Sequence, residues 1–210
     1  MDIYTAINTR RTIRDFTDKQ IEMSIIEKII DAGLKAPTND HMRSWEFVVV
    51  NDKSIRAEIL RGVLETKLTT KAEISKLLDY WKMTDTVQRD MYLDAIPKQF
   101  DMLYNAGALI LPFFRMDEDL LNPKSIGSLN EFASIWCCIE NMLLAATAEG
   151  IFGVTRIPIM NDQQYVKSVL QHPDEYVLPC FIALGYPKED CVINTQLETD
   201  LKNKLHIDKW

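Results

Sequence analysis

The chain has 210 residues, of which 47% are hydrophobic and 26% are charged, and these globular values exclude a mostly disordered chain. This length allows one domain of ordinary size, and because no linker or repeat interrupts it, we expect residues 1–210 to form a single domain. The net charge of −7 argues against nucleic acid as the main partner, because binding to phosphates needs a positive surface.

The first half of the chain combines predicted helices with one strand. Residues 2–9 indicate a short helix, and residues 21–34 carry isoleucine and leucine at helical spacing. Ser24 and Glu27 have the spacing of a capping box at the start of that second helix. The β-branched run at 45–50 predicts a strand, and residues 54–64 predict another helix.

The second half begins with a polar segment at 65–96, which we interpret as one or two amphipathic helices that form an outer cover or flap. Residues 106–114 and 177–184 are apolar runs that predict strands, and residues 128–149 predict a long helix. That helix is apolar nearly all round, so we expect it to be buried on every side, in the domain or between two subunits. The tail at 191–210 ends in tryptophan, which suggests an arm that docks on a partner chain. These elements predict a small sheet with helices on both faces.

The sequence lacks the spacings of several common sites. It has no G-x-G-x-x-G fingerprint and no P-loop, and its four cysteines and three histidines form no zinc pattern, so we expect no metal. The N-terminus has no apolar signal stretch. The apolar region at 132–148 is interrupted by Glu140 and Asn141, so we expect no membrane span and a reducing compartment such as the cytoplasm.

The first candidate binding residues are Arg10, Arg11, Thr12 and Arg14. Arginine forks match phosphate oxygens two at a time, and a threonine hydroxyl adds a donor, so this run predicts a cradle for a phosphate-bearing ligand. The simpler alternative is a solvated basic turn that pairs with the surplus acids.

A second candidate is the loop that contains Pro37, Thr38, Asn39 and His41, between a predicted helix and a strand. Loops at the ends of elements supply donors to ligands. The alternative is a turn that stops the helix, with Asn39 chosen for turn chemistry. No nucleophile or carboxylate can be assigned to His41, so we predict no catalytic dyad there.

The long predicted helix and the turn after it supply a third group. Glu140 and Asn141 lie within the helix, and we interpret them as structurally satisfied polar groups. Gly150 is in the position of a helix C-terminal glycine, and Gly153 would allow close approach of the backbone to a ligand.

Taken in order, several segments resemble the FMN-dependent nitroreductase family. They cover most of the chain except about residues 53–105 and 154–176. The segments are R-R-T-I-R-D-F at 10–16, A-P-T at 36–38, W-E-F-V-V-V at 45–50, N-M-L-L-A-A at 141–146, L-G-Y-P at 184–187 and the terminus at 205–210.

This resemblance implies an α+β fold with a small central, mainly antiparallel sheet flanked by helices, in an intertwined homodimer with FMN at the interface. By similarity, Arg10, Arg11, Thr12 and Arg14 would hold the FMN phosphate and ribityl chain. Pro37, Thr38, Asn39 and His41 would come from the second copy, and backbone N–H groups of Ile151, Phe152 and Gly153 would lie near flavin N5. The long helix would form the dimer core.

The sequence departs from the family pattern in three places. Arg43 and Ser44 stand where the family usually has a pair such as Gln-Pro, and the turn after the long helix is G-I-F-G-V-T-R. Many members direct an arginine or lysine after L-G-Y-P at the phosphate, whereas here Lys188 is followed by acidic and neutral residues until Lys202, so that either Arg156 or no residue fills this role.

The implied activity is a flavin oxidoreductase that works in alternating half-reactions. NADH or NADPH would deliver hydride to flavin N5, and a nitroaromatic, a quinone or a free flavin would then be reduced, with no side chain as catalytic acid or base. The segment at 65–96 would select the acceptor. The alternatives are a flavin-binding sensor or storage module without turnover, and a helical interaction protein without cofactor.

Overall fold

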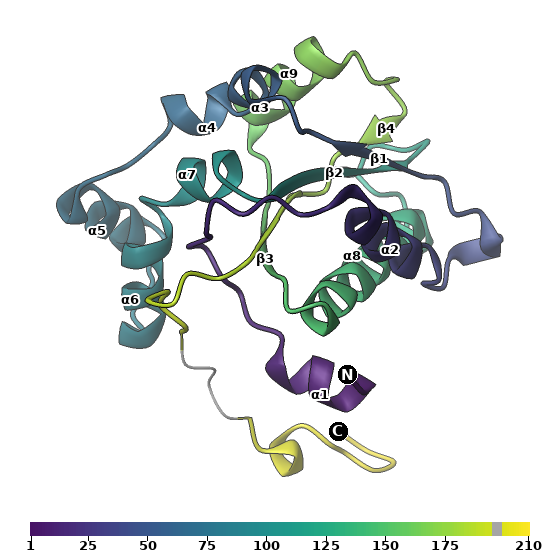
Figure 1. Ribbon diagram of the computed structural model, residues 1–210. Helices are drawn as coiled ribbons and strands as arrows, with labels where there is room; N and C mark the ends of the chain where they lie inside the picture. The colour runs from purple at the N-terminus through teal and green to yellow at the C-terminus, as the bar shows by residue number, and fades with distance from the viewer. Residues whose placement is uncertain (195–198) are drawn as a thin grey trace.

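A five-stranded sheet organises the chain, in a computed structural model that describes residues 1–194 and 199–210. Its strands are β1 (Trp45–Val49), β2 (Ala108–Arg115), β3 (Phe152–Arg156), β4 (Tyr176–Val177) and β5 (Phe181–Gly185). The order is β1-β2-β5-β3, with β4 beside β2, and every pairing is antiparallel (Figure 1). The central strands β2 and β5 are buried along almost their whole length because helices cover both faces of the sheet.

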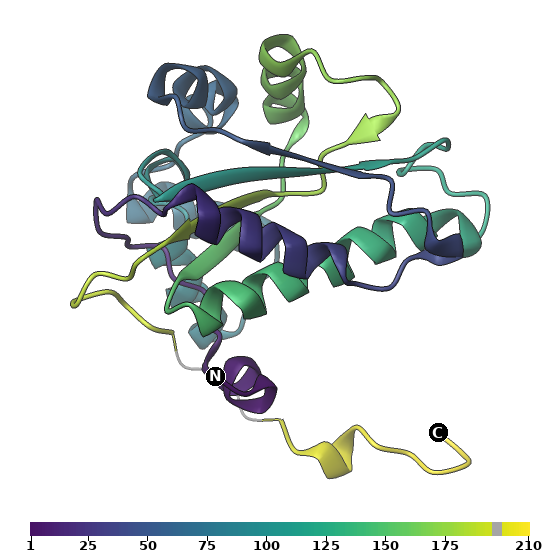
Figure 2. The ribbon, with the colours of Figure 1, turned by 45° about the vertical axis from the view of Figure 1, so that its right-hand side comes forward.

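Two helix layers enclose the sheet (Figure 2). On one face lie α2 (Met23–Leu34) and α8 (Asn130–Ala148), whose Ile29, Ile135 and Met142 belong to one apolar core. On the other face lie α3 (Lys53–Ile59), α4 (Arg61–Glu65), α7 (Gln99–Tyr104) and α9 (Met160–Leu170). Their apolar side chains form a second core with β2 and β5, so the sheet separates two clusters.

The helices α5 (Lys71–Tyr80) and α6 (Thr86–Ala95) stand to one side of these layers (Figure 1). They have a small core of their own around Ile74, Leu78 and Ile96. Thr70 and Glu73 form a capping box at the start of α5, and Asp85 caps α6. One or two amphipathic helices were expected between residues 65 and 96, and the structure has two.

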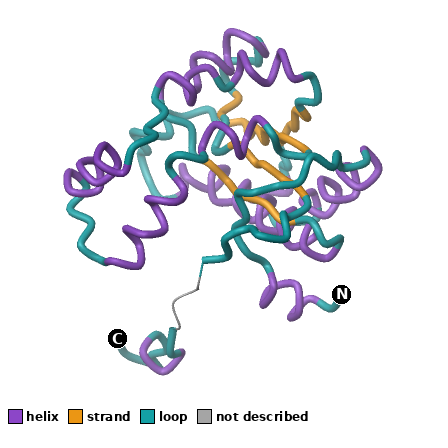
Figure 3. Tube along the Cα trace, turned by 60° about the vertical axis from the view of Figure 1, so that its left-hand side comes forward, coloured by secondary structure: helices purple, strands orange, loops and turns teal. Residues whose placement is uncertain are grey.

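The two ends of the chain lie outside the layers. The N-terminal helix α1 (Ile3–Thr9) contacts α8, and short 3-10 turns occur at Asn39–His41, Gly127–Leu129 and Leu201–Asn203. The segment 199–210 extends away from the sheet and its helices (Figure 3), and its large apolar side chains, Leu201, Leu205, Ile207 and Trp210, are exposed.

The helices expected at 2–9, 21–34 and 128–149 are confirmed within a few residues, as are the strands at 45–50, 106–114 and 177–184. Two expectations were wrong in detail. Ser24 and Glu27 form no capping box, because α2 begins at Met23 and Glu22 occupies the N-cap without a side-chain bond. The helix expected at 54–64 is divided at Leu60 into α3 and α4.

The single chain buries only part of the long helix, so its expected burial between two subunits stays a prediction. Only one face of α8 is buried in the single chain, while Phe132, Trp136, Leu143 and Leu144 on other faces are half-buried and Glu140 is exposed. The helix ends as expected at Gly150, which has a φ of 72°. The N–H of Gly150 donates to Thr147 O at 3.0 Å and that of Ile151 donates to Ala146 O at 2.9 Å, which closes the last turn.

Candidate cofactor site

The N-terminal segment after α1 runs along the outer edge of β3. Thr12 forms a parallel bridge with Gly153, and the N–H of Ile13 donates to Gly153 O at 3.2 Å. Ile13 and Phe16 are buried in the second core, so the segment is anchored by apolar side chains. This anchoring brings Arg10, Arg11 and Thr12 to β3, although the two stretches are far apart in sequence.

These residues line a cavity of about 210 Å³, which we call the arginine cavity. Its lining comprises Arg10, Arg11, Thr12, Trp136, Ile139, Glu140, Leu143, Thr147, Gly153, Val154 and Thr155. The Arg10 Nε lies 3.3 Å from Glu140 Oε1, in a pair whose side chains are 29% and 52% exposed. Arg11 Nη1 donates to the carbonyls of Asn8 and Arg10 at 2.8 and 2.7 Å. The Thr12 hydroxyl has no hydrogen-bond partner within the described residues, so it is available to a ligand.

Arg14 faces a different and larger cavity, of about 500 Å³, which we call the Arg14 cavity. Its lining comprises Arg14, Thr66, Leu68, Leu77, Trp81, Met91, Tyr92, Ala95, Ile96, Gln99, Met102, Val154, Thr155, Arg156, Ile157 and Ile159. Two arginines and two aromatic side chains therefore line a space whose described lining contains no carboxylate. Val154 and Thr155 border both cavities, so the two lie next to each other along β3.

The charge of Arg14 is partly withdrawn from solvent. Burial lowers the pKa of Arg14 below its usual value, and the carboxylates of Asp94 and Asp15 oppose that effect. Lys98 Nζ lies 2.7 Å from an oxygen of each of these two carboxylates. Burial lowers the pKa of Lys98, but its hydrogen bonds to Asp15 and Asp94 outweigh burial and raise it above the usual value. The resulting cluster connects α6 to the segment that carries Arg14.

The loop after α2 lines a third cavity, of about 260 Å³, which we call the Thr38 cavity. Thr38 and Asn39 border it, whereas Pro37 and His41 are exposed and do not. Thr38 Oγ1 is buried without a hydrogen-bond partner in the described structure, which is costly unless a ligand or second chain supplies one.

The backbone of this loop is strained. His41 and Arg43 have φ values of 56° and 42°, in the left-handed region that disfavours side chains. Arg43 Nε donates to Leu34 O at 3.2 Å and so caps the end of α2. Strained backbone of this kind occurs often at ligand sites.

The Thr38 cavity and the arginine cavity lie at different places on α8. Glu131 borders the first and Glu140 borders the second. These two residues are roughly 14 Å apart along the helix, at about 1.5 Å per residue. Within one chain, the structure therefore brings Arg10, Arg11 and Thr12 together with Gly153, but it does not bring Thr38 and Asn39 to them.

Of Ile151, Phe152 and Gly153, the three residues expected near flavin N5, only Gly153 lines the arginine cavity. Ile151 is fully buried in the first core, and Phe152 is half-buried within β3. A Cβ on Gly153 would lie 2.5 Å from Leu184 Cδ2 and 2.8 Å from Ala183 O. Packing against β5 therefore explains the glycine without a ligand.

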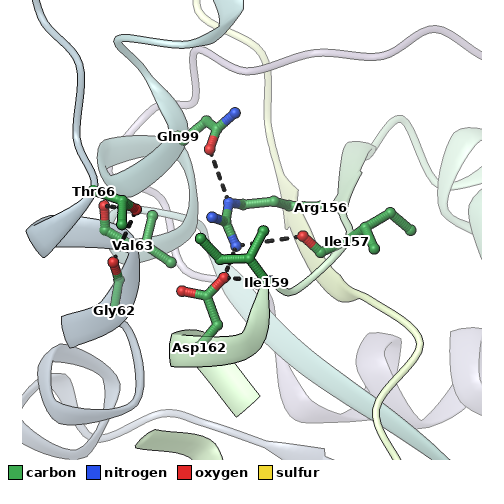
Figure 4. A network of polar contacts seen from close by, with 8 residues as sticks. All are labelled: Gly62, Val63, Thr66, Gln99, Arg156, Ile157, Ile159 and Asp162. Atoms are coloured by element: carbon green, nitrogen blue, oxygen red, sulfur yellow. Dashed lines mark hydrogen bonds and ion pairs between the residues drawn. The ribbon is translucent and has the colours of Figure 1, made fainter. Parts of the chain in front are cut away.

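Sequence reasoning missed the partner of Arg156, whose side chain forms a buried network at the end of β3 (Figure 4). Arg156 Nη1 lies 2.6 Å from Asp162 Oδ2, and Arg156 Nε donates to Gln99 Oε1 at 3.0 Å. Asp162 also accepts from the N–H of Ile159 at 2.8 Å. Arg156 borders the Arg14 cavity and not the arginine cavity.

The described residues were searched for metal sites and for helices that could span a membrane. They contain no group of three or more histidine, cysteine or acidic residues that could hold a metal ion. None of the helices described is long and apolar enough to cross a bilayer.

The sequence was compared with family models and with known proteins. Residues 7–186 match the family model described as "Nitroreductase family". Mouse iodotyrosine deiodinase 1 is 28% identical over 205 residues, a match that covers 97% of this chain and 66% of the relative. A Methanothermobacter thermautotrophicus protein, provisionally named NADH dehydrogenase/NAD(P)H nitroreductase, is 24% identical over 222 residues, with 100% of this chain and 88% of the relative covered.

A solved structure supports the same fold. The crystal structure of oxidized iodotyrosine deiodinase bound to FMN and 3-iodo-L-tyrosine superposes with a TM-score of 0.73. The match covers 100% of both chains at 17% sequence identity. At that identity the likeness establishes a shared fold and not a shared substrate.

Proposed function

The chain belongs to the nitroreductase family, and on that premise we propose that it is an FMN-dependent oxidoreductase. It takes electrons from NADH or NADPH and reduces an electron-poor acceptor such as a nitroaromatic, a quinone or a flavin. One observation carries the proposal: a small cavity with Arg10, Arg11 and Thr12 adjoins a larger one with Arg14 and aromatic walls. A ligand that joins a phosphate to a planar ring would place the phosphate in the first cavity and the ring in the second.

The arginine cavity suits the phosphate of FMN. Arginine guanidinium groups bind phosphate oxygens in pairs, and the Thr12 hydroxyl adds a donor. These positive charges offset the phosphate in a chain whose net charge is −7. Glu140 weakens the cradle, because its carboxylate already lies 3.3 Å from Arg10.

The Arg14 cavity suits the ring of the cofactor. Its apolar and aromatic lining covers a planar ring, and Arg14 offers a positive charge to the ring oxygens. When bound, FMN supplies a ring that accepts hydride and passes on electrons, so the chain's own residues bind it, orient it and exclude water. No side chain is required as a catalytic acid or base. The N–H groups of residues 151–153 stay a prediction as N5 contacts, and Gly153 is the member of this turn that borders a cavity.

A second copy of the chain would complete the site. Pro37, Thr38, Asn39 and His41 of that copy would contact the ring, which accounts for the buried, unpartnered Thr38 hydroxyl. The half-buried Trp136 and Leu143 leave part of α8 apolar and uncovered, as expected for a helix at the core of a homodimer.

A halogenated phenol is a second candidate acceptor. Mouse iodotyrosine deiodinase 1 aligns with 97% of this chain, although the chain spans only 66% of that relative. Reductive deiodination consumes two electrons and one proton, replaces the C–I bond by C–H and releases iodide. The same NAD(P)H-reduced cofactor would supply the electrons.

The visible absorption spectrum of the purified protein tests the proposal. We expect a flavin band after FMN is added, and we expect NADPH or NADH to bleach it without oxygen. A band that persists with both nucleotides would favour a sensor or storage module. No bound flavin in excess FMN would contradict the proposed function at its centre. Reoxidation by a nitroaromatic, a quinone or 3-iodotyrosine then identifies the acceptor class.

A further inference from the structure

We propose that Arg156 is a second guanidinium, besides Arg14, that faces the ring of bound FMN and raises the cofactor's reduction potential. The inference rests on the proposed function. Arg156 borders the Arg14 cavity together with Thr155 and Ile157, and it comes from the end of β3.

The hydrogen bonds of Arg156 leave part of its guanidinium unused. A guanidinium has five N–H donors. Nε donates to Gln99 Oε1, and Nη1 donates to Asp162 Oδ2 at 2.6 Å and to Ile157 O at 3.5 Å. Nη2 has no acceptor in the described part of the chain. The side chain is only 8% exposed, so the cavity is the place where these two remaining N–H groups can meet an acceptor.

The network holds the guanidinium in a fixed orientation. Asp162 is 0% exposed and comes from the first turn of α9, while Gln99 comes from the start of α7 (Figure 4). A Cβ on Gly62 would lie 2.7 Å from Asp162 Oδ1, so this glycine allows α4 to pack against the carboxylate. The pair therefore presents its positive end to the cavity and keeps its negative end in the protein interior.

A fixed positive charge acts differently on the two states of the cofactor. The ring becomes more negative when it gains two electrons, and charges interact strongly where water is excluded. The carboxylates nearest to these charges, Asp94 and Asp15 for Arg14 and Asp162 for Arg156, are not among the described lining residues, so the guanidinium groups lie nearer to the cavity than their counter-charges. Arg156 should therefore stabilise the reduced cofactor more than the oxidised one. This difference in binding raises the reduction potential of the bound cofactor.

The test compares variants with effects of opposite sign. Arg156→Gln/Asp162→Asn removes both charges and should lower the ratio of reduced to oxidised FMN affinity about tenfold, or about 30 mV in midpoint potential for two electrons. Asp162→Asn alone keeps the guanidinium, removes its counter-charge and should raise that ratio. Asparagine still offers an oxygen to the N–H of Ile159, so the backbone contact is preserved. The measurement is a redox titration followed by flavin absorbance.

Arg56→Gln is the matched control, because Arg56 is buried but borders none of the three cavities. It should lower thermal stability without a change in the potential. If both Asp162→Asn and the double variant shift the potential in the same direction, or neither does, Arg156 is only structural and the inference is overturned. Absence of FMN binding by the unmodified protein would instead defeat the proposed function.

Discussion

Arg56 and Arg156 are both buried arginines, but their surroundings differ. Arg56, 1% exposed, donates only to backbone carbonyls, those of Val50, Tyr104 and Ala106, at 2.6 to 3.2 Å. Arg156 pairs with Asp162 and keeps unused N–H groups beside a cavity. The hydrogen bonds of Arg56 join the ends of β1 and α7 to α3. A buried cation that has used its donors on carbonyls stabilises the fold, whereas one with donors left over at a cavity is a candidate for binding.

The largest effect is expected on FMN affinity, when arginines that line the two cavities are replaced. Arg10→Ala/Arg14→Ala should weaken FMN binding by about 3–6 kcal/mol in sum, because each charged hydrogen bond contributes about 1.5–3 kcal/mol. Titration of FMN by fluorescence measures it, and Arg61→Ala, an exposed arginine paired with Glu65, is the control. Unchanged affinity would mean that the arginine run is a solvated basic turn.

The next effect concerns stability. Arg56→Met should reduce the free energy of unfolding by about 3–4 kcal/mol, because three backbone carbonyls, two of them in buried hydrogen bonds, lose a charged partner. The melting temperature should fall by roughly 10 °C for a chain of this size. FMN affinity of the folded fraction should stay the same, and a marked loss of affinity would show that Arg56 also shapes the site.

A smaller effect is expected in the outer helices. Thr70→Ala removes the capping box of α5 and should cost about 1 kcal/mol. Hydrogen exchange should increase in α5 but not in β2, since α5 and α6 have their own small core. Equal acceleration in β2 would show that the outer helices unfold together with the sheet. Thr66→Ala, outside any capping box, serves for comparison.

The smallest expected effect is a gain in FMN affinity. Glu140→Gln removes the carboxylate 3.3 Å from Arg10 and should tighten FMN binding by about 0.2–1 kcal/mol, the usual range for exposed ion pairs. Glu149→Gln, at the exposed end of the same helix and paired with Lys28, should leave affinity unchanged. Weaker binding in Glu140→Gln would show that Glu140 helps to orient Arg10 rather than competing for it.

Much of the fold was predictable because its signals are local. The apolar period of α2 and α8, the β-branched run of β1 and the turn at Gly150 each depend on residues within one element. The α+β fold with a small antiparallel sheet, expected from the family resemblance, is confirmed. The strand β3 was missed, because its short run F-G-V-T-R contains a glycine and an arginine and its burial comes from β5 and α8.

The candidate site was predictable only in part. The arginine run and the loop at Thr38 were visible as residue types, but their division among three cavities was not. Asp162 carried no signal in the sequence, because an aspartate in the first turn of a helix is common for reasons of capping and dipole. Its partner lies on another element, and only packing of α9 on β3 brings the two together.

The sequence by itself determined the family, the main helices and strands, and the residue types offered to a phosphate and a ring. Those properties follow from composition, period and motif, which are local. Tertiary structure alone decided that Arg10 faces Glu140, that Arg14 and Arg156 share a cavity, and that Arg56 is closed off by carbonyls. Each depends on atoms from distant segments, and the hydrogen bonds and burial that set a side chain's role exist only once those segments have packed.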